Sequence, residues 1–157
     1  MAGNVGNWGN LRAAGNPVVF FDLHANKQKL GRVVFELYRD VCPKAAENFR
    51  QFCTGEFRWW GVPTGYKDTC LHRVAEEKFI EGGDFVGNGL NCRPRFSVWG
   101  EEVLFEDESF AVGHGEVGLL SLVNAGGKGN GNVFRILAGA CPELDGKRVV
   151  FGGTVDE

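Results

Sequence analysis

The chain has 157 residues, the size of one ordinary domain, and 43% of them are hydrophobic, which is typical of a globular protein. Its formal net charge of −3 gives no support to direct nucleic-acid binding. No apolar run approaches the roughly 20 residues of a membrane-spanning helix, so no membrane partner is expected.

The cysteines and the N-terminus indicate the kind of compartment. The five cysteines are odd in number and include no C-x-x-C pair that would suggest a zinc or redox site. We therefore expect reduced thiols, no metal and no cofactor in an intracellular protein, cytoplasmic or nuclear, with an organelle or a cytoskeletal assembly left open. Residues 1–15 are rich in Asn and Gly and predict a flexible extension before a domain at 16–157.

The first half of the domain predicts a hairpin followed by a helix. Residues 17–23 and 32–38 are β-branched and aromatic runs joined by turn residues, which is typical of paired strands. In residues 43–53 the apolar side chains recur at spacings of three and four, so they share one helix face. Pro43 suits the first turn of this helix, and Gly55 suits its end.

The rest of the chain predicts a loop and several short strands. Residues 56–67 carry turn residues with Trp59 and Trp60, which we expect on the surface or against a partner. Short apolar stretches separated by glycines then predict a mostly β fold, a closed or nearly closed barrel. They are residues 70–75, 78–80, 118–123, 132–137 and 148–152.

Ordered stretches of this sequence are similar to the cyclophilin family. They are residues 16–22, 42–49, 52–56, 72–74, 82–85, 120–126 and 144–152, and together the likeness covers about residues 16–153. The stretch 55–67 resembles most closely the small spliceosome-associated cyclophilin. The resemblance implies an antiparallel β-barrel capped by helices, with an outer groove that holds a proline-containing peptide or protein segment and speeds its cis/trans rotation.

That reaction needs little covalent chemistry. The barrier to rotation is about 18–20 kcal/mol, because resonance stiffens the peptide bond. A catalyst therefore needs an apolar seat for the proline ring and a cationic donor that favours the twisted amide. The family uses an arginine as the donor, and the matching residue here is Arg73.

The groove positions that match the family depart from its pattern. Lys78 and Arg135 replace two phenylalanines, Glu81 replaces a glutamine and Glu143 replaces a tryptophan. Phe79 stands for a methionine, Val133 for a second glutamine and Arg148 for a histidine. The full set of matched positions is Arg73, Lys78, Phe79, Glu81, Val123, Asn124, Ala125, Val133, Arg135, Glu143, Leu144 and Arg148, of which Arg73, Asn124, Ala125 and Leu144 keep the usual residue.

We expect the new charges to pair with one another, with Lys78, Arg135 and Arg148 near the two glutamates, and Glu81 to bind Arg73. Such a groove predicts weak or absent isomerase activity and weak binding of cyclosporin-type inhibitors. It favours a binding or structural subunit of a larger protein assembly. Two alternatives stay open: a working isomerase that assists folding, and chaperone-like capture of unfolded clients, which charges in the groove disfavour.

Three other features have simpler interpretations. Residues 126–131 predict turn glycines, because they lack the G-K-[ST] of a phosphate-binding loop. His114 is interpreted as a loop residue, and the acidic residues in 101–108 as a solvated face. Family members continue past residue 152 into a helix and a strand that closes the barrel, so we expect an exposed sheet edge that a partner covers, or an incomplete sequence.

Overall fold

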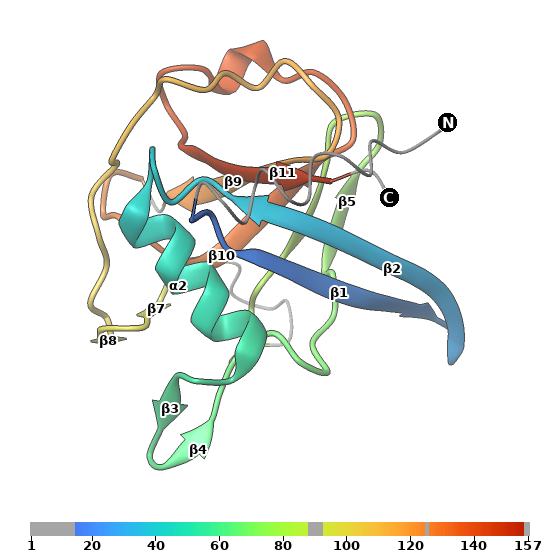
Figure 1. The fold of residues 1–157 in the computed structure, drawn as a ribbon, viewed down its shortest axis with the longest axis vertical. Coiled ribbons are helices and arrows are strands. Elements are labelled where there is room, and N and C mark those ends of the chain that lie inside the picture. The colour runs from blue at the N-terminus through green and yellow to red at the C-terminus, as the bar shows by residue number, and fades with distance from the viewer. Residues whose placement is uncertain (1–14, 88–92, 125, 156–157) are drawn as a thin grey trace.

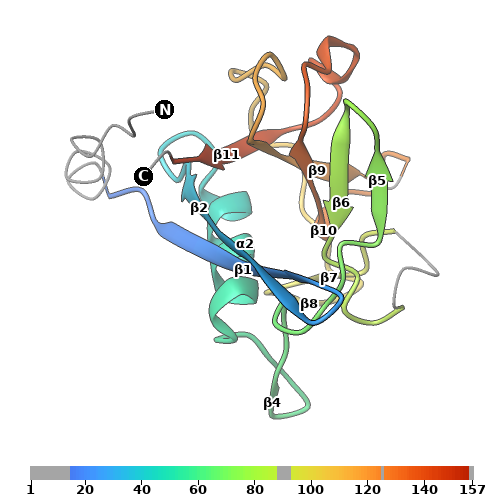
Figure 2. The same cartoon turned by 90° about the vertical axis from the view of Figure 1, so that its right-hand side faces the viewer.

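A seven-stranded antiparallel sheet forms the body of the computed structural model, which describes residues 15–87, 93–124 and 126–155. Its order is β1-β2-β11-β9-β10-β6-β5, and Figures 1 and 2 show it curling around the helix. The strands are β1 (Val18–Ala25), β2 (Gln28–Leu37), β5 (Arg73–Ala75), β6 (Phe79–Gly82), β9 (Leu119–Asn124), β10 (Asn130–Leu137) and β11 (Val150–Thr154). The mostly β prediction is confirmed.

The sheet is open in the part of the chain that the structure describes. β1 and β5 lie at its two edges, and β1 pairs with β2 alone, so the exposed edge expected from the sequence is present. The predicted hairpin is also confirmed, with Asn26 and Lys27 at φ +49° and +64° in the turn. Of the predicted extension at 1–15, all but Gly15 lies outside the described residues.

The helix α2 (Pro43–Thr54) forms the centre of the core. Pro43 stands in its first turn, and Gly55 ends it in the left-handed conformation at φ +76°, as predicted. Phe49, which is buried, has ring centroids of Phe134 and Phe151 within 5.1 and 5.2 Å. Burial of one apolar face therefore explains why this segment is a helix packed inside the sheet.

Among the described residues, no helix is long and apolar enough to cross a membrane.

Two of the acidic residues in 101–108, Asp107 and Glu108, bind other parts of the fold, so the solvated-face interpretation is wrong for these two, whereas Glu101, Glu102 and Glu106 are exposed. Glu108 accepts hydrogen bonds from the backbone N–H groups of Lys44 (3.0 Å) and Ala45 (2.8 Å), at the start of α2. Asp107 accepts a hydrogen bond from the amide of Asn130 (2.9 Å). The carboxylates thus satisfy donors at the helix start and at the first residue of β10, which a sequence pattern does not reveal.

The predicted loop at 56–67 contains a small hairpin of β3 (Arg58–Trp59) and β4 (Val62–Pro63), which extends away from the sheet in Figure 1. Trp59 is partly buried and packs on Phe96, with ring centroids 5.0 Å apart, whereas Trp60 is 87% exposed at the turn. Surface exposure is confirmed for Trp60 only. Phe96 belongs to a second small pair, β7 (Phe96–Ser97) and β8 (Gly100–Glu101).

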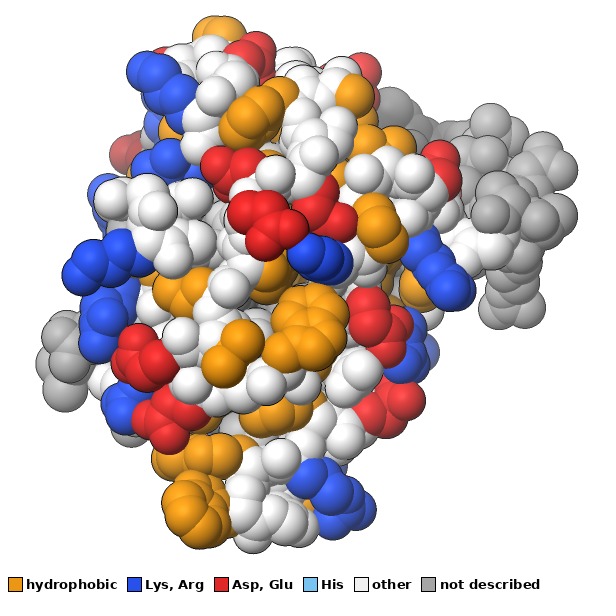
Figure 3. All heavy atoms as spheres, turned by 90° about the vertical axis from the view of Figure 1, so that its left-hand side faces the viewer, with side chains coloured by type: hydrophobic (Ala, Val, Ile, Leu, Met, Phe, Trp, Pro, Cys, Tyr) orange, Lys and Arg blue, Asp and Glu red, His pale blue; other side chains and the backbone are white. Residues whose placement is uncertain are grey.

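The side of the molecule seen in Figure 3 carries apolar side chains in separate groups among acidic and basic ones. Such mixed surfaces are ordinary for folded proteins. The four described cysteines, Cys42, Cys53, Cys70 and Cys141, are free, as predicted, and Cys92 lies outside the described residues.

Candidate functional site

Strand register aligns the predicted donor with two of the substituted positions. Arg73 on β5 lies opposite Glu81 on β6, and Glu81 lies opposite Arg135 on β10. Arg135 in turn lies opposite Ser121 on β9. Directly opposed residues in an antiparallel sheet point to the same face, so these four side chains form one row across four strands. Phe79, two residues before Glu81, shares that face.

Glu81 is the centre of the row. Its side chain is 2% exposed, and its Oε2 accepts a hydrogen bond from Nε of Arg135 at 2.9 Å. Its Oε1 lies 3.1 Å from Nε2 of His72, whose side chain is 5% exposed. His72 is therefore a packing residue with a local hydrogen bond, as predicted.

The predicted ion pair between Glu81 and Arg73 is present but long, and Arg135 makes a closer one with the same carboxylate. Nη1 of Arg73 lies 4.0 Å from Oε2 of Glu81, the oxygen that already accepts the hydrogen bond from Arg135. Arg135 is 14% exposed and Arg73 is 58% exposed. The more buried guanidinium has lost more of its water and gains more from the carboxylate, which explains the choice of partner.

Arg135 also covers the one aromatic ring at this site. Its guanidinium carbon lies 4.2 Å from the ring centroid of Phe79, and that of Arg73 lies 5.4 Å away. Both distances are within the range of cation–π attraction. Two guanidinium groups thus lie close to the ring of Phe79, that of Arg135 nearer than that of Arg73.

A second ion pair joins two further positions. Nζ of Lys78 lies 3.1 Å from Oε1 of Glu143, which belongs to the short 3-10 helix η1 (Pro142–Leu144). The hydrogen bond to Glu143 raises the pKa of Lys78. The backbone N–H of Glu143, and then Lys78, lower the pKa of Glu143. Both side chains are about half exposed, so this pair contributes little to the stability of the fold.

Three other matched positions are part of the framework. Val133 is fully buried, and Val123 nearly so. Asn124 ends β9, and its side-chain oxygen accepts hydrogen bonds from the N–H groups of Gly127 (2.9 Å) and Gly129 (3.4 Å). Those two glycines have φ of +84° and +117°, so the turn prediction is confirmed for residues 126–129, whereas Gly131 lies in β10.

The remaining matched positions do not join the row. Arg148 donates from Nη1 to the carbonyl of Lys147 at 2.8 Å, and no ion pair links it to the predicted carboxylates among the described residues. Leu144 is partly buried beside the smaller core cluster. Ala125 lies outside the described residues. The structure thus brings together Arg73, Phe79, Glu81 and Arg135, with Lys78 and Glu143 paired separately.

His114 lies in a loop, as predicted, but its side chain is buried and connects two polar groups. Its Nδ1 lies 2.9 Å from Oδ1 of Asp145, and its Nε2 lies 2.8 Å from Oγ of Ser121. The backbone N–H of His114, followed by its ring, lowers the pKa of Asp145. Ser121 is fully buried, so this serine–histidine–aspartate chain offers no accessible nucleophile. In the sequence, the one feature that pointed to this buried hydrogen-bonded chain is the polar residue Ser121 inside the apolar run 119–123.

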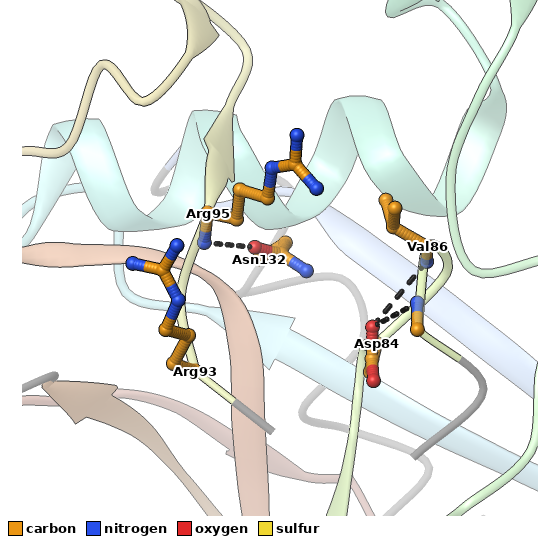
Figure 4. A pocket seen from close by; sticks show the side chains of 6 residues that line it. Asp84, Val86, Arg93, Arg95 and Asn132 are labelled. Atoms are coloured by element: carbon orange, nitrogen blue, oxygen red, sulfur yellow. Dashed lines mark hydrogen bonds between the residues drawn. The ribbon is translucent and has the colours of Figure 1, made fainter. Parts of the chain in front are cut away.

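Two cavities in the described part of the chain lie away from the row. One is lined by Asp84, Val86, Gly87, Arg93, Arg95 and Asn132 (Figure 4). Asn132 faces inward there and accepts a hydrogen bond from the N–H of Arg95 at 2.9 Å. The other is lined by Gly15, Asn16, Arg39 and Asp40.

Comparisons with known proteins identify the family. The model for "Cyclophilin type peptidyl-prolyl cis-trans isomerase/CLD" matches residues 20–157. Peptidyl-prolyl cis-trans isomerase H of Rhizopus delemar is 46% identical over 143 residues, 89% of this chain and 77% of the relative. Peptidyl-prolyl cis-trans isomerase CYP22 of Arabidopsis thaliana is 48% identical over 138 residues, 87% of this chain and 67% of the relative. Peptidyl-prolyl cis-trans isomerase 11 of Caenorhabditis elegans is 45% identical over 147 residues, 93% of this chain and 78% of the relative. The fold and these relatives agree with the sequence resemblance: this chain belongs to the cyclophilin-type peptidyl-prolyl cis-trans isomerase family.

Proposed function

We propose that this cyclophilin domain binds protein segments as a subunit of a larger assembly and catalyses prolyl rotation weakly or not at all. The observation that carries the proposal is the position of Arg135. Its guanidinium binds the buried Glu81 and lies 4.2 Å from the centre of the Phe79 ring, on the face that the family uses for proline.

The energetic argument rests on what a proline ring would have to displace. Moving Arg135 off Phe79 separates it from Glu81, and leaving one member of a buried ion pair unpaired costs about 3–5 kcal/mol. A loss of about 3 kcal/mol in transition-state binding already lowers a rate about 100-fold. The aromatic anchors absent at Lys78 and Glu143 add to this loss.

An active isomerase is the second candidate, and two observations favour it. Arg73, the matched donor, is 58% exposed and thus accessible to a peptide amide. The relatives that share 45–48% identity are named peptidyl-prolyl cis-trans isomerases. On this alternative, binding energy from the rest of the peptide would pay for the displacement of Arg135.

A rotation assay on a proline test peptide separates the two candidates. The purified chain is compared with the Rhizopus delemar relative, and we expect its kcat/KM to be at least about 100-fold lower. The double variant Arg135→Phe with Glu81→Gln returns the family's residues to both positions. Its kcat/KM should be at least about tenfold higher than that of the wild type. Wild-type activity close to that of the relative would sink the proposal. Co-purification with a defined assembly supports the subunit role, and a monomer in cell extracts speaks against it.

A further inference from the structure

Among the described cations around Phe79, Arg73 has the longest ion pair. Lys78 is bound to Glu143 at 3.1 Å, and Arg135 is bound to Glu81 at 2.9 Å. The carboxylate oxygen nearest to Arg73 within the described part of the chain lies 4.0 Å away and already accepts the hydrogen bond from Arg135. A mostly exposed guanidinium therefore keeps its hydrogen-bonding capacity for a ligand.

The ion pairs around Phe79 leave Arg73 with the weakest electrostatic partner. Lys78 and Arg135 each lie close to a glutamate, at 3.1 and 2.9 Å, whereas the carboxylate oxygen of Glu81 lies 4.0 Å from Arg73. Glu76 and Glu77 in the adjoining β5–β6 turn form no ion pair with Arg73 within 4.0 Å in the described structure. Because the other two cations are bound more closely, Arg73 is the one of the three whose charge is least compensated by an ion pair.

The chemistry of guanidinium selects the partner. Its planar fork of N–H donors matches the two oxygens of a carboxylate, and the adjacent ring of Phe79, 5.4 Å away, restricts the orientation of that fork. We infer that this face selects protein segments with an acidic residue directly before proline, and that Arg73 binds the acidic side chain. The inference rests on the proposed function, in which the domain binds protein segments, and adds the residue that those segments present to Arg73.

Three labelled peptides of the form Ala-Ala-X-Pro-Ala-Ala, with X as Glu, Gln or Lys, provide the test. Fluorescence anisotropy in about 20 mM salt should show the Glu peptide binding at least about fivefold more tightly than the Gln peptide, the factor for about 1 kcal/mol from one good surface pair. The Lys peptide should bind most weakly. The difference should shrink in about 300 mM salt, because exposed charges are screened.

Variants assign the effect to one side chain. Arg73→Met should make the Glu and Gln peptides bind equally. Arg58→Met, which removes an exposed arginine on the distant β3–β4 hairpin and changes the net charge equally, should keep the ratio (Figure 1). Equal binding of the Glu and Gln peptides to the wild type overturns the inference and leaves the proposed binding function standing. Failure of all three peptides to bind overturns both.

Discussion

The glutamate at position 81 determines which neighbouring side chains can form hydrogen bonds and ion pairs. A glutamine at this position, the usual family residue, would leave a guanidinium at position 135 without a counter-charge. With glutamate, a 2% exposed carboxylate distributes its two oxygens between His72 and Arg135. Glu81 and Arg135 are thus a matched pair of changes, because each would be a buried unpaired charge without the other.

The stability of the protein should therefore depend more on the buried pair than on the exposed one. Glu81→Gln is expected to lower the free energy of unfolding by about 2 kcal/mol or more, since Arg135 loses its counter-charge. The matched change Glu143→Gln, in the half-exposed pair with Lys78, should cost less than about 1 kcal/mol. Urea unfolding of both variants measures the difference, and equal losses would contradict the role given to burial.

At the scale of elements, α2 depends on a remote residue for its start. Cys42, at the N-cap, makes no side-chain hydrogen bond to the helix. Glu108, from the irregular segment after β8, supplies both acceptors instead. Its negative charge also lies at the positive end of the helix dipole. The segment that crosses the helix start is thereby fixed to α2.

Removal of this charge should weaken the helix. Glu108→Gln is expected to lower the free energy of unfolding by about 1 kcal/mol, the usual value of an N-cap. Glu106→Gln, two residues earlier and paired with Lys44 on the surface, serves as the control and should cost less than about 0.5 kcal/mol. Thermal or urea unfolding compares the two, and a larger loss for Glu106→Gln would refute the capping role.

The same helix carries a carboxylate whose effect depends on pH. Hydrogen bonds from Arg50, and further from Gln51, lower the pKa of Glu47 from 4.5 to about 2. A group with a lowered folded-state pKa stabilises the fold above its unfolded pKa and loses that contribution as pH falls through the folded value. The cost of Glu47→Gln should therefore be constant near neutral pH and disappear between pH 4.5 and about 2. A cost that persists at pH 2 would indicate a packing effect instead.

At the scale of the whole molecule, the open sheet places the candidate site and the free edge far apart in strand order. Arg73 lies on β5 at one edge, and β1 forms the other. The core between them is continuous, with Phe35 on β2, Phe134 on β10 and Phe151 on β11 all buried. The central strands should therefore open together when the protein unfolds, whereas each edge strand should be able to open by itself.

Amide hydrogen exchange tests this arrangement. Amides in β9, whose residues 119–123 are buried and which pairs on both sides, should exchange at least about tenfold more slowly than those in β1. The reason is that edge amides open without disrupting the core. Uniform protection of β1 and β9 would mean that another chain or segment pairs with β1 in solution.

Local patterns were sufficient for the elements that local chemistry defines. The spacing of Ala45, Phe49 and Phe52 predicted the helix, and Pro43 and Gly55 predicted its ends. Alternation and turn residues predicted the first hairpin, and the ordered motifs predicted the family that the comparisons then showed. These features depend on neighbours within a few residues, where propensity and side-chain period act directly.

By itself, the sequence determined which residue types stand at the groove, and only the tertiary structure decided how they pair. Arg73, Glu81 and Arg135 are separated by up to 62 positions in the chain, and strand register alone places them in one row. Arg135 is a closer partner of Glu81 than Arg73 is, and this difference depends on relative burial. The hydrogen bond between His114 and Ser121 likewise depends on the burial of both side chains. Burial is set by all the strands together, because the loss of water that strengthens an ion pair exists only in the packed fold.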